Sequence, residues 1–428
     1  MAGSTPRTVA VVGAGMVGLA TAWFLQERGV AVTVIDRADV AAGASWGNAG
    51  WLTPAIATPL PEPAVLAYGI RAVLTPNSPL YVKPAPDLQL ARFVAGFTRH
   101  STPDRWRRAM QALIPVNNRS LEAFDHLTSN GVAAQTHEAT QFIAGYSDVA
   151  QVKTMLDEFK QIEAAGGHVE HELIGGDEAR RREPAISDGV EAALMIRGQR
   201  FLNPVTFVHA LADAVRERGG QIITDATVTD VQDRGNSVRV ETTGGGGGTY
   251  DAAVVATGAW LGDLVRQYGV HMVVQAGRGY SFSVQTEHMP SGPIYFPESR
   301  VAITPLGDRL RVAGMMEFRR PDEALDPRRI SAIVESTRPM LRGADLDDRS
   351  EEWVGSRPCT PDGLPLVGRT DSGRVFVAGG HGMWGITLGP ITGELLAQQI
   401  VTGTVPSELA PFNPRRKLNW TPHRLRRD

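Results

Sequence analysis

Three glycines and one aspartate near the start of the chain have the types and spacing needed to bind a dinucleotide. Gly13, Gly15 and Gly18 form a G-x-G-x-x-G sequence, and Asp36 follows them by about 20 residues. Gly13 permits a tight turn, Gly15 lets backbone N–H groups approach a pyrophosphate, and Gly18 allows a helix to make close contact with a strand. The Asp36 carboxylate would accept hydrogen bonds from the adenosine ribose hydroxyls and would disfavour a 2′-phosphate, which argues against NADP.

Two strands and a helix must hold these residues in place. The apolar run V-A-V-V at 9–12 predicts a buried strand, and the apolar residues after Gly18 recur along a predicted helix that ends at Gly29. The run A-V-T-V-I at 31–35 predicts a second strand that ends at Asp36. Glycines also occur in ordinary turns, so the alternative is a βαβ turn that binds nothing. The flanking strands and the spaced aspartate favour dinucleotide binding.

The composition is that of a globular chain with a sizeable core. Its 428 residues are 42% apolar and 21% charged, with a net charge of −3, so nothing in the overall charge indicates a nucleic-acid partner. The single cysteine, Cys359, excludes an internal disulfide and a cysteine-cluster metal site. We expect no signal peptide, and we expect no membrane span, because no apolar run is long enough to cross a bilayer. We therefore expect a cytoplasmic location, or at most a peripheral one at the inner membrane.

The rest of the chain alternates between helical and strand-like patterns. Small residues fill 41–50, where the alternative to a ligand-binding segment is a flexible loop, and eight prolines between 54 and 86 predict an extended segment that covers a binding site. Helices are predicted over 87–128, 148–166, 203–219 and 390–400, and strands over 221–224, 226–231, 237–241, 250–256 and 375–378. Four segments between 277 and 318 predict an antiparallel sheet with a hairpin at 307–308, whereas the glycine run 244–248 predicts only a mobile turn. Because dinucleotide-type pieces occur at the start, middle and end, the fold class is α/β with a discontinuous nucleotide-binding domain.

Seven motifs, taken together and in order, carry a resemblance to a known family. They are the 13–36 unit, S-W-G-N-A-G at 45–50, A-T-G at 256–258, G-Y-S at 279–281, R-V-A-G-M at 311–315, W-V-G-S-R-P-C-T-P-D-G at 353–363 and G-G-H-G-M-W-G at 379–385. With these motifs the chain resembles the FAD-dependent D-amino-acid oxidase superfamily, and within it most closely the bacterial D-amino-acid dehydrogenases. The resemblance covers nearly the whole chain and is more specific for the superfamily than for one substrate.

The resemblance implies a Rossmann-like FAD-binding domain of the GR2/DAO type and a substrate domain with an antiparallel β-sheet and flanking helices. Ranges 1–55, 200–265 and 350–412 would form the FAD-binding domain, 56–199 and 266–349 the substrate domain, and 413–428 a basic C-terminal tail. The cofactor-binding residues implied by the motifs are Gly13, Gly15, Met16, Val17, Gly18, Asp36, Arg37, Ser45, Asn48, Ala49, Gly50, Leu52, Val228, Thr257, Gly258, Gly355, Gly380, His381, Gly382, Gly385 and Thr387.

Arg357 resembles the arginine that binds the substrate carboxylate in this family. The chemistry supports that role independently, because a guanidinium is always charged and offers a two-pronged donor that matches a carboxylate. The alternative is a structural arginine paired with Glu351, Glu352 or Asp362.

Two aromatic residues complete the implied catalytic set. Tyr280 would contact the substrate or only pack within a strand, and Trp384 would form a wall of the pocket or only pack. His381 is expected to be a backbone element of the flavin loop, not a base. Met383 differs from the arginine that the glycine-oxidase branch has there, and Cys359 does not align with a flavin-linking cysteine, so FAD is expected to be non-covalent.

The implied reaction is hydride transfer from the α-carbon of a D-amino acid to the flavin, giving an imino acid that water converts to a 2-oxo acid and ammonia. The implied partners are the amino-acid substrate and an electron acceptor, quinone or oxygen. Three alternatives remain open: oxidation of a secondary amine such as D-proline, hydroxyproline or an N-methyl amino acid, an NAD-dependent dehydrogenase, and a flavin-binding protein without activity. The sequence leaves the oligomeric state open. The basic tail is expected to be a solvated end, with peripheral contact to anionic lipid as the alternative.

Overall fold

The computed structural model describes residues 5–63, 80–82, 86–245 and 247–417. One half of the molecule is built on a six-stranded sheet in which five strands run parallel and the last is antiparallel. Its order is β10 (Gln221–Ile223), β2 (Ala31–Ile35), β1 (Thr8–Val12), β14 (Ala252–Val255), β21 (Val375–Gly379) and β20 (Leu366–Arg369). Ranges 1–55, 200–265 and 350–412 each supply two of these strands, so the chain enters this sheet three times.

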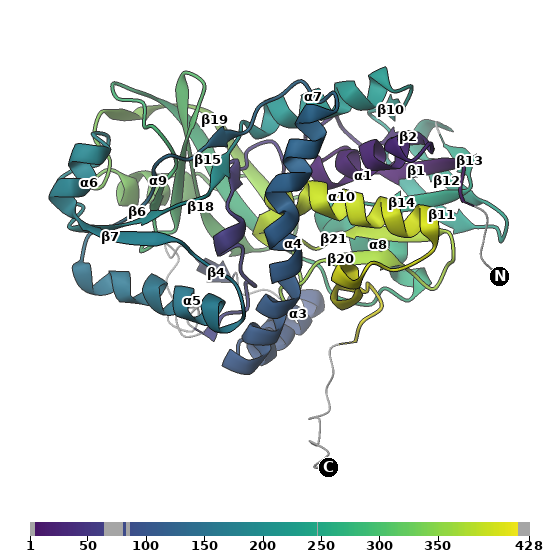
Figure 1. Cartoon of the computed structure of the whole chain (residues 1–428). Helices are drawn as coiled ribbons and strands as arrows, with labels where there is room; N and C mark the ends of the chain where they lie inside the picture. The colour runs from purple at the N-terminus through teal and green to yellow at the C-terminus, as the bar shows by residue number, and fades with distance from the viewer. Residues whose placement is uncertain (1–4, 64–79, 83–85, 246, 418–428) are drawn as a thin grey trace, which may run out of the picture.

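Both faces of the six-stranded sheet are covered, which explains why its central strands are continuously apolar. Val9 and Val11 of β1 share a core with helices α1 (Met16–Glu27), α7 (Pro204–Glu217) and α10 (Gly385–Thr402). On the other face, Ala10 and Val12 pack with helix α8 (Leu261–Val265) and a three-stranded sheet, β11 (Val228–Asp233), β12 (Val238–Thr242) and β13 (Gly248–Tyr250). Figure 1 shows α1 and α10 side by side, as their contacts require.

The other half is built on a larger, mostly antiparallel sheet of nine strands. Along it lie β19 (Ala344–Cys359), β15 (Gln275–Thr286), β18 (Arg309–Phe318), β17 (Val301–Leu306), β16 (Ile294–Phe296), β6 (Phe142–Tyr146), β8 (Ala192–Ile196) and β7 (His171–Gly175), and β4 (Leu80–Val82) pairs with β18. Helices α6 (Gly176–Arg182) and α9 (Pro327–Thr337) pack on one face, and α5 (Val152–Ala164) packs on the other.

The long helix α4 (Pro103–Ser129) runs between the two halves and contacts both α10 and α5 (Figure 1). Helix α3 (Leu88–His100) precedes α4. A separate small antiparallel sheet consists of β3 (Trp51–Leu52), β9 (Arg200–Phe201) and β5 (His137–Glu138). None of the described helices is both long and apolar enough to span a membrane.

Most predicted elements are present, and the mixed α/β architecture is confirmed. Asp148 and Asn203 cap helical segments as predicted, because their carboxylate and amide oxygens accept backbone N–H groups of Ala150 and Val205. The hairpin at 307–308 joins β17 to β18. The glycine run does more than turn, since Gly248 begins β13.

Three expectations need correction or lie outside the described residues. Helix α10 begins at Gly385, five residues before the predicted start, and Pro390 lies inside it. The covering segment 54–86 is described only at 54–63, 80–82 and 86. The start of the basic tail is anchored by ion pairs of Arg415 with Asp371 and of Arg416 with Asp362, while Arg415 and Lys417 are exposed; residues 418–428 lie outside the described part.

Candidate functional site

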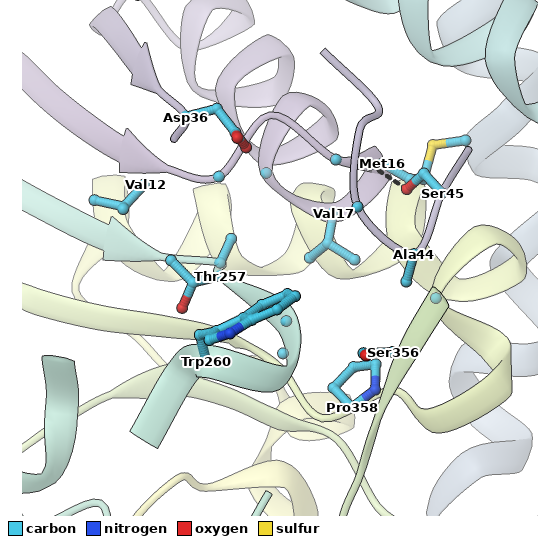
Figure 2. Close-up of a pocket in the computed structure, with 18 of the residues that line it drawn as sticks. Val12, Met16, Val17, Asp36, Ala44, Ser45, Thr257, Trp260, Ser356 and Pro358 are labelled. Carbon is cyan, nitrogen blue, oxygen red and sulfur yellow. Dashed lines mark hydrogen bonds between the residues drawn. The ribbon is translucent and has the colours of Figure 1, made fainter. Parts of the chain in front are cut away.

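A cavity of about 400 Å³ opens at the carboxyl ends of β1, β2 and β14, where parallel sheets of this kind bind ligands. Its lining comes from the start, the middle and the end of the chain. Figure 2 shows Thr257 and Trp260 on one side, facing Val17 and the turn before α1. The Ser45 hydroxyl lies beside the first residue of α1 and accepts the Met16 N–H at 3.3 Å (Figure 2).

The glycine turn forms one end of the cavity. A Cβ on Gly13, whose φ is +116°, would lie 2.5 Å from the Ala256 carbonyl oxygen, and a Cβ on Gly18 would lie 1.9 Å from the Gly13 carbonyl oxygen. Gly15 is different, because its Cβ would meet only the Ser45 hydroxyl, at 3.3 Å, and would otherwise take up space in front of α1. The first N–H groups of a helix lack intrahelical acceptors and carry a partial positive charge, so this end of α1 suits a phosphate.

Asp36 lies at the end of β2 and lines the cavity. Its carboxylate accepts the Ala14 N–H at 2.7 Å and the Ala38 N–H at 3.0 Å, which holds it beside the glycine turn. A carboxylate has about four acceptor positions, so capacity remains for ribose hydroxyls. On the opposite wall the Thr257 hydroxyl is buried, and no described group bonds to it. A buried hydroxyl without a partner is costly, so Thr257 supports the fit of a polar ligand such as FAD in this cavity.

Fifteen of the 21 predicted cofactor-binding residues line the cavity: Gly13, Gly15, Met16, Val17, Gly18, Asp36, Arg37, Ser45, Asn48, Val228, Thr257, Gly258, His381, Gly382 and Gly385. Ala49, Gly50, Leu52, Gly355, Gly380 and Thr387 do not. Two of these have contacts within the protein instead: a Cβ on Gly50 would lie 2.0 Å from the Leu202 carbonyl oxygen, and the Thr387 hydroxyl donates to the Trp51 carbonyl at 2.9 Å. These six remain in the neighbourhood of the site without lining it.

Arg357 lines the same cavity from the end of β19. Its guanidinium lies flat on Gly279, where a Cβ would be 2.1 Å from the guanidinium carbon, and its Nη1 donates to the Met315 carbonyl at 2.8 Å. Met315 has a left-handed backbone, with φ of +65°, at a bulge in the pairing of β18 with β15.

The three acids considered as structural partners of Arg357 have other partners. Glu351 pairs with Arg311 at 2.9 Å, Glu352 with Arg349 at 3.0 Å, and Asp362 with Arg416 at 2.7 Å. Among the described residues, none forms an ion pair with Arg357, and burial lowers the pKa of its guanidinium. Arg357 is half-buried in the wall of the cavity, so its guanidinium could pair with an anionic group of a ligand bound there.

The other two predicted catalytic residues lie away from the large cavity. Tyr280 is 1% exposed and donates to Glu317 at 2.8 Å, and Glu317 also pairs with Arg319 and Arg329. This geometry matches the packing alternative for Tyr280 and gives it no place in the cavity. Trp384 lines a second, small cavity, where its indole N–H donates to the Thr58 carbonyl at 2.8 Å.

His381 and Cys359 are buried beside the small cavity. Burial lowers the pKa of His381 to about 4, and its Nε2 lies 2.9 Å from the Thr392 hydroxyl, so this imidazole is neutral near pH 7. Burial raises the pKa of Cys359 to about 12, which keeps the thiol protonated and unreactive.

Sequence reasoning missed several lining residues: Ala42, Gly43, Ala44, Thr227, Thr229, Trp260, Asp263, Ser356 and Pro358. The small-residue run 41–50 did point to the first three. Among these, Trp260 has the most contacts with other site residues. The Arg37 guanidinium stacks on the Trp260 ring at 3.7 Å, and the Trp260 indole N–H donates to Asp322 at 3.0 Å. The sequence did offer one indication of this role, because Trp260 follows the predicted cofactor-binding turn Thr257-Gly258 by two residues.

The chain is similar to known proteins in family, in sequence and in fold. Residues 8–399 match the family described as FAD dependent oxidoreductase (DAO). The chain is 29% identical over 408 residues to a D-amino acid dehydrogenase from Cereibacter sphaeroides, which covers 93% of this chain and 92% of that protein. Its fold is similar to that of glycine oxidase from Geobacillus kaustophilus (TM-score 0.72, 21% identity, 96% and 99% coverage) and of L-proline dehydrogenase from P. horikoshii (TM-score 0.67, 18% identity, 96% and 98% coverage).

Proposed function

The chain belongs to the FAD-dependent oxidoreductase family, and we propose that it oxidises the Cα–N bond of D-amino acids to yield 2-oxo acids and ammonia. The observation that carries this proposal is Arg357, a half-buried guanidinium without an acid partner among the described residues, in the cavity that begins at the dinucleotide turn. The relatives named D-amino acid dehydrogenase support the choice of substrate. The domain division expected from the sequence is part of the same proposal.

Bound FAD supplies the acceptor for the hydride that leaves the substrate α-carbon. The chain's own contribution is to bind and orient. The two-pronged guanidinium of Arg357 holds the substrate carboxylate, and the flat surface of Gly279 together with the Met315 carbonyl fixes that guanidinium. Burial in the cavity favours the uncharged amine, and neutral His381 adds no positive charge that would oppose loss of the hydride. The imino acid that results is hydrolysed by water.

Non-covalent attachment of FAD forms part of this proposal. The single cysteine, Cys359, is 1% exposed and carries a protonated thiol, so it is a poor nucleophile for a flavin ring. Acid precipitation should therefore leave intact FAD in the supernatant; flavin retained in the pellet would refute this part.

The test of the proposal is Arg357→Ala and Arg357→Lys, assayed as holoenzyme by anaerobic bleaching of the flavin with D- and L-amino acids. A charge-assisted pair contributes roughly 1.5 to 3 kcal/mol, so kcat/KM for D-substrates should fall by about tenfold to a hundredfold or more. Lys should not restore the rate, because an ammonium lacks the planar fork. Simple amines without a carboxylate should react at the same low rate in all three proteins.

Wild-type kcat/KM in a folded, FAD-loaded Arg357→Ala protein would show that Arg357 is structural. Faster flavin reduction by L-amino acids would overturn the stereochemical part. Running the same panel with an artificial dye and with oxygen identifies the acceptor class, for which a quinone and oxygen are the two candidates.

Oxidation of a secondary amine is the second candidate. It is favoured by the fold shared with L-proline dehydrogenase and by a mechanism that needs no strong base in the cavity. Met383 lines the cavity where the glycine-oxidase branch has an arginine, which disfavours glycine itself. Higher kcat/KM for D-proline or an N-methyl amino acid than for any primary D-amino acid would select this candidate.

A further inference from the structure

We propose that Met383 limits the length of the substrate side chain, because it separates the large cavity from the small one next to Arg357. The inference rests on the proposed function and adds a specificity-determining residue to it. Met383 would contact the substrate side chain directly, so it decides which side chains fit and leaves the hydride transfer itself unchanged.

The small cavity lies on the same side of β19 as Arg357. Arg357 and Cys359 are two residues apart on this strand, so both project from one face of the larger sheet. The Met316 sulfur lies 4.0 Å from Nη1 of Arg357, and a Cβ on Gly277 would lie 2.5 Å from this sulfur and 2.8 Å from that of Cys359. Cys359 lines the small cavity. A substrate whose carboxylate binds Arg357 therefore has its α-carbon near this cavity.

Three residues, His381, Gly382 and Met383, line both cavities and form the partition between them. A β-bridge between Cys359 and His381 holds this tripeptide against the end of β19. Gly382 has no side chain, and the His381 imidazole is fixed by the Thr392 hydroxyl, 2.9 Å from its Nε2. The Met383 side chain is thus the part of the partition that sets how far a substrate group can extend.

The lining of the small cavity suits an apolar group. Its polar side chains bond within the protein: the Thr360 hydroxyl donates to the Leu364 carbonyl at 2.8 Å, the Trp384 indole N–H to the Thr58 carbonyl at 2.8 Å, and the Thr58 hydroxyl to a carboxylate at 3.2 Å. Among the described residues that line this cavity, none is ionised near pH 7, since His381 is neutral there. Its apolar lining consists of Leu60, Cys359 and Met383.

The volume of the small cavity sets the size of the group that it takes. It is about 10 Å³, which is room for about one water-sized group. A methyl group is of that size, whereas a straight chain of four carbons would have to displace Met383. The outer wall is fixed, because Leu60 and Met383 pack on a core made of Leu90, Phe93, Phe97, Met316, Phe318 and Cys359. Shortening Met383 would therefore join the two cavities without removing this wall.

Straight-chain carboxylates test the partition without turnover. Propionate and hexanoate have the carbon chains of D-alanine and D-norleucine but lack the amine that is oxidised. Their dissociation constants are measured from the change in the flavin spectrum of the holoenzyme. We expect Met383→Ala to strengthen binding of hexanoate relative to propionate by at least about tenfold, because even one methylene group changes recognition in an apolar pocket by about that factor. An unchanged ratio would overturn the inference.

Two control variants separate side-chain length from loss of a methionine. Met383→Leu conserves the volume of the side chain, and Met289→Ala removes a methionine that is 40% exposed and lines neither cavity. Both should keep the wild-type ratio of the two dissociation constants. A shift in Met383→Leu as large as that in Met383→Ala would show that length is not what Met383 controls. If Met383→Ala fails to retain FAD, Met383→Val, which is two atoms shorter than methionine, is measured against the same criterion.

Anaerobic flavin reduction extends the test to substrates. Met383→Ala should raise the ratio of kcat/KM for D-norleucine to that for D-alanine at least about tenfold over the wild type. If D-amino acids reduce the flavin but neither this ratio nor the binding ratio changes, only this inference fails. If no D-amino acid reduces the flavin, the proposed function fails, and carboxylate binding alone then decides the role of Met383. Absence of carboxylate binding in the wild type would remove Arg357 as the anchor and overturn both.

Discussion

The Arg357 guanidinium lies on a surface that only a glycine leaves open. The position of this guanidinium depends on two backbone features, the missing Cβ of Gly279 and the left-handed Met315, whose carbonyl accepts Nη1. A non-glycine residue with φ of +65° costs free energy that the surrounding sheet must supply, and such strain is concentrated at functional positions. Arg357 is therefore fixed in place before any substrate arrives.

Gly279→Ala tests this arrangement. The new Cβ would lie 2.1 Å from the guanidinium carbon, so Arg357 must move while its charge is retained. We expect kcat/KM for D-amino acids to fall at least about tenfold, with the FAD content unchanged. Gly175→Ala, in β7 of the same sheet and with no atom near the added Cβ, is the matched control. Wild-type kinetics in Gly279→Ala would mean that the position of Arg357 tolerates displacement.

His381 gives a pH-dependent prediction. Its pKa is lowered to about 4 in the folded protein and is 6.5 in the unfolded chain, so the unfolded state binds more protons between these values. Stability is therefore complete above pH 6.5 and falls as the pH drops toward 4, by about 2 kcal/mol at pH 5. Thermal unfolding at pH 7 and pH 5 should show a smaller decrease in Tm for His381→Gln than for the wild type. An identical decrease would assign the acid sensitivity to other groups.

The predicted site residues that the structure brings together most clearly are those whose position follows from the local backbone. Gly13, Gly15, Gly18 and Asp36 occur within one βαβ unit, where spacing along the chain determines spacing in the structure. Tyr280 could not be placed, because an alternating strand does not reveal which face of a sheet meets the cavity. Trp260 acts with Asp322, a partner more than 60 residues away, and no local pattern connects the two.

At the scale of elements, the contact of α1 with α10 determines where the phosphate-binding end of α1 lies. The sequence predicted a later start for α10 because proline normally begins a helix. The helix instead includes Pro390, at the cost of one backbone hydrogen bond, since its preceding turn supplies the cavity residues Gly385 and Ile386. Gly389 and Gly393 lie one turn apart and let α10 approach the α1 backbone.

Gly393→Ala should separate these two helices. Its Cβ would lie 2.6 Å from the Thr21 nitrogen, a backbone atom that cannot rotate away. Overpacking of this kind costs about 1 to 3 kcal/mol, so Tm should fall by several degrees, and FAD affinity should fall because the first turn of α1 moves. Gly262→Ala, in α8 with open space around the added Cβ, should have neither effect. Unchanged Tm and FAD affinity in Gly393→Ala would show that the two helices can separate without affecting the site.

At the scale of the whole molecule, the site belongs to neither sheet alone. The six-stranded sheet supplies the glycine turn and Asp36, whereas β19 of the larger sheet supplies Ser356, Arg357 and Pro358. The sequence predicted that the chain would return twice to its first domain, because each of the three segments carries a local motif. It did not predict strand order or how the halves meet, since these depend on contacts between distant residues.

A group of side-chain contacts between the two halves, here called the clasp, borders the cavity near Asp36. Arg37 follows β2, Trp260 follows β14, and Asp322 follows β18 of the larger sheet. Asp322 accepts the Trp260 indole N–H at 3.0 Å and pairs with Arg37 at 3.5 Å, while Arg37 stacks on the Trp260 ring at 3.7 Å. Since Arg37 and Trp260 line the cavity, we expect the clasp to slow the release of FAD bound there.

Asp322→Ala removes both contacts that the clasp makes to the larger sheet. Exposed ion pairs contribute at most about 1 kcal/mol, and the indole hydrogen bond adds a similar amount, so FAD should dissociate about three- to tenfold faster. Flavin reduction in the fully loaded variant should keep its wild-type rate, because Asp322 does not line the cavity. Asp347→Ala, which breaks a comparably exposed pair with Arg338 elsewhere on the larger sheet, controls for loss of surface charge. An FAD dissociation rate in Asp322→Ala equal to that of the control would mean that the halves are held together around the cofactor without this clasp.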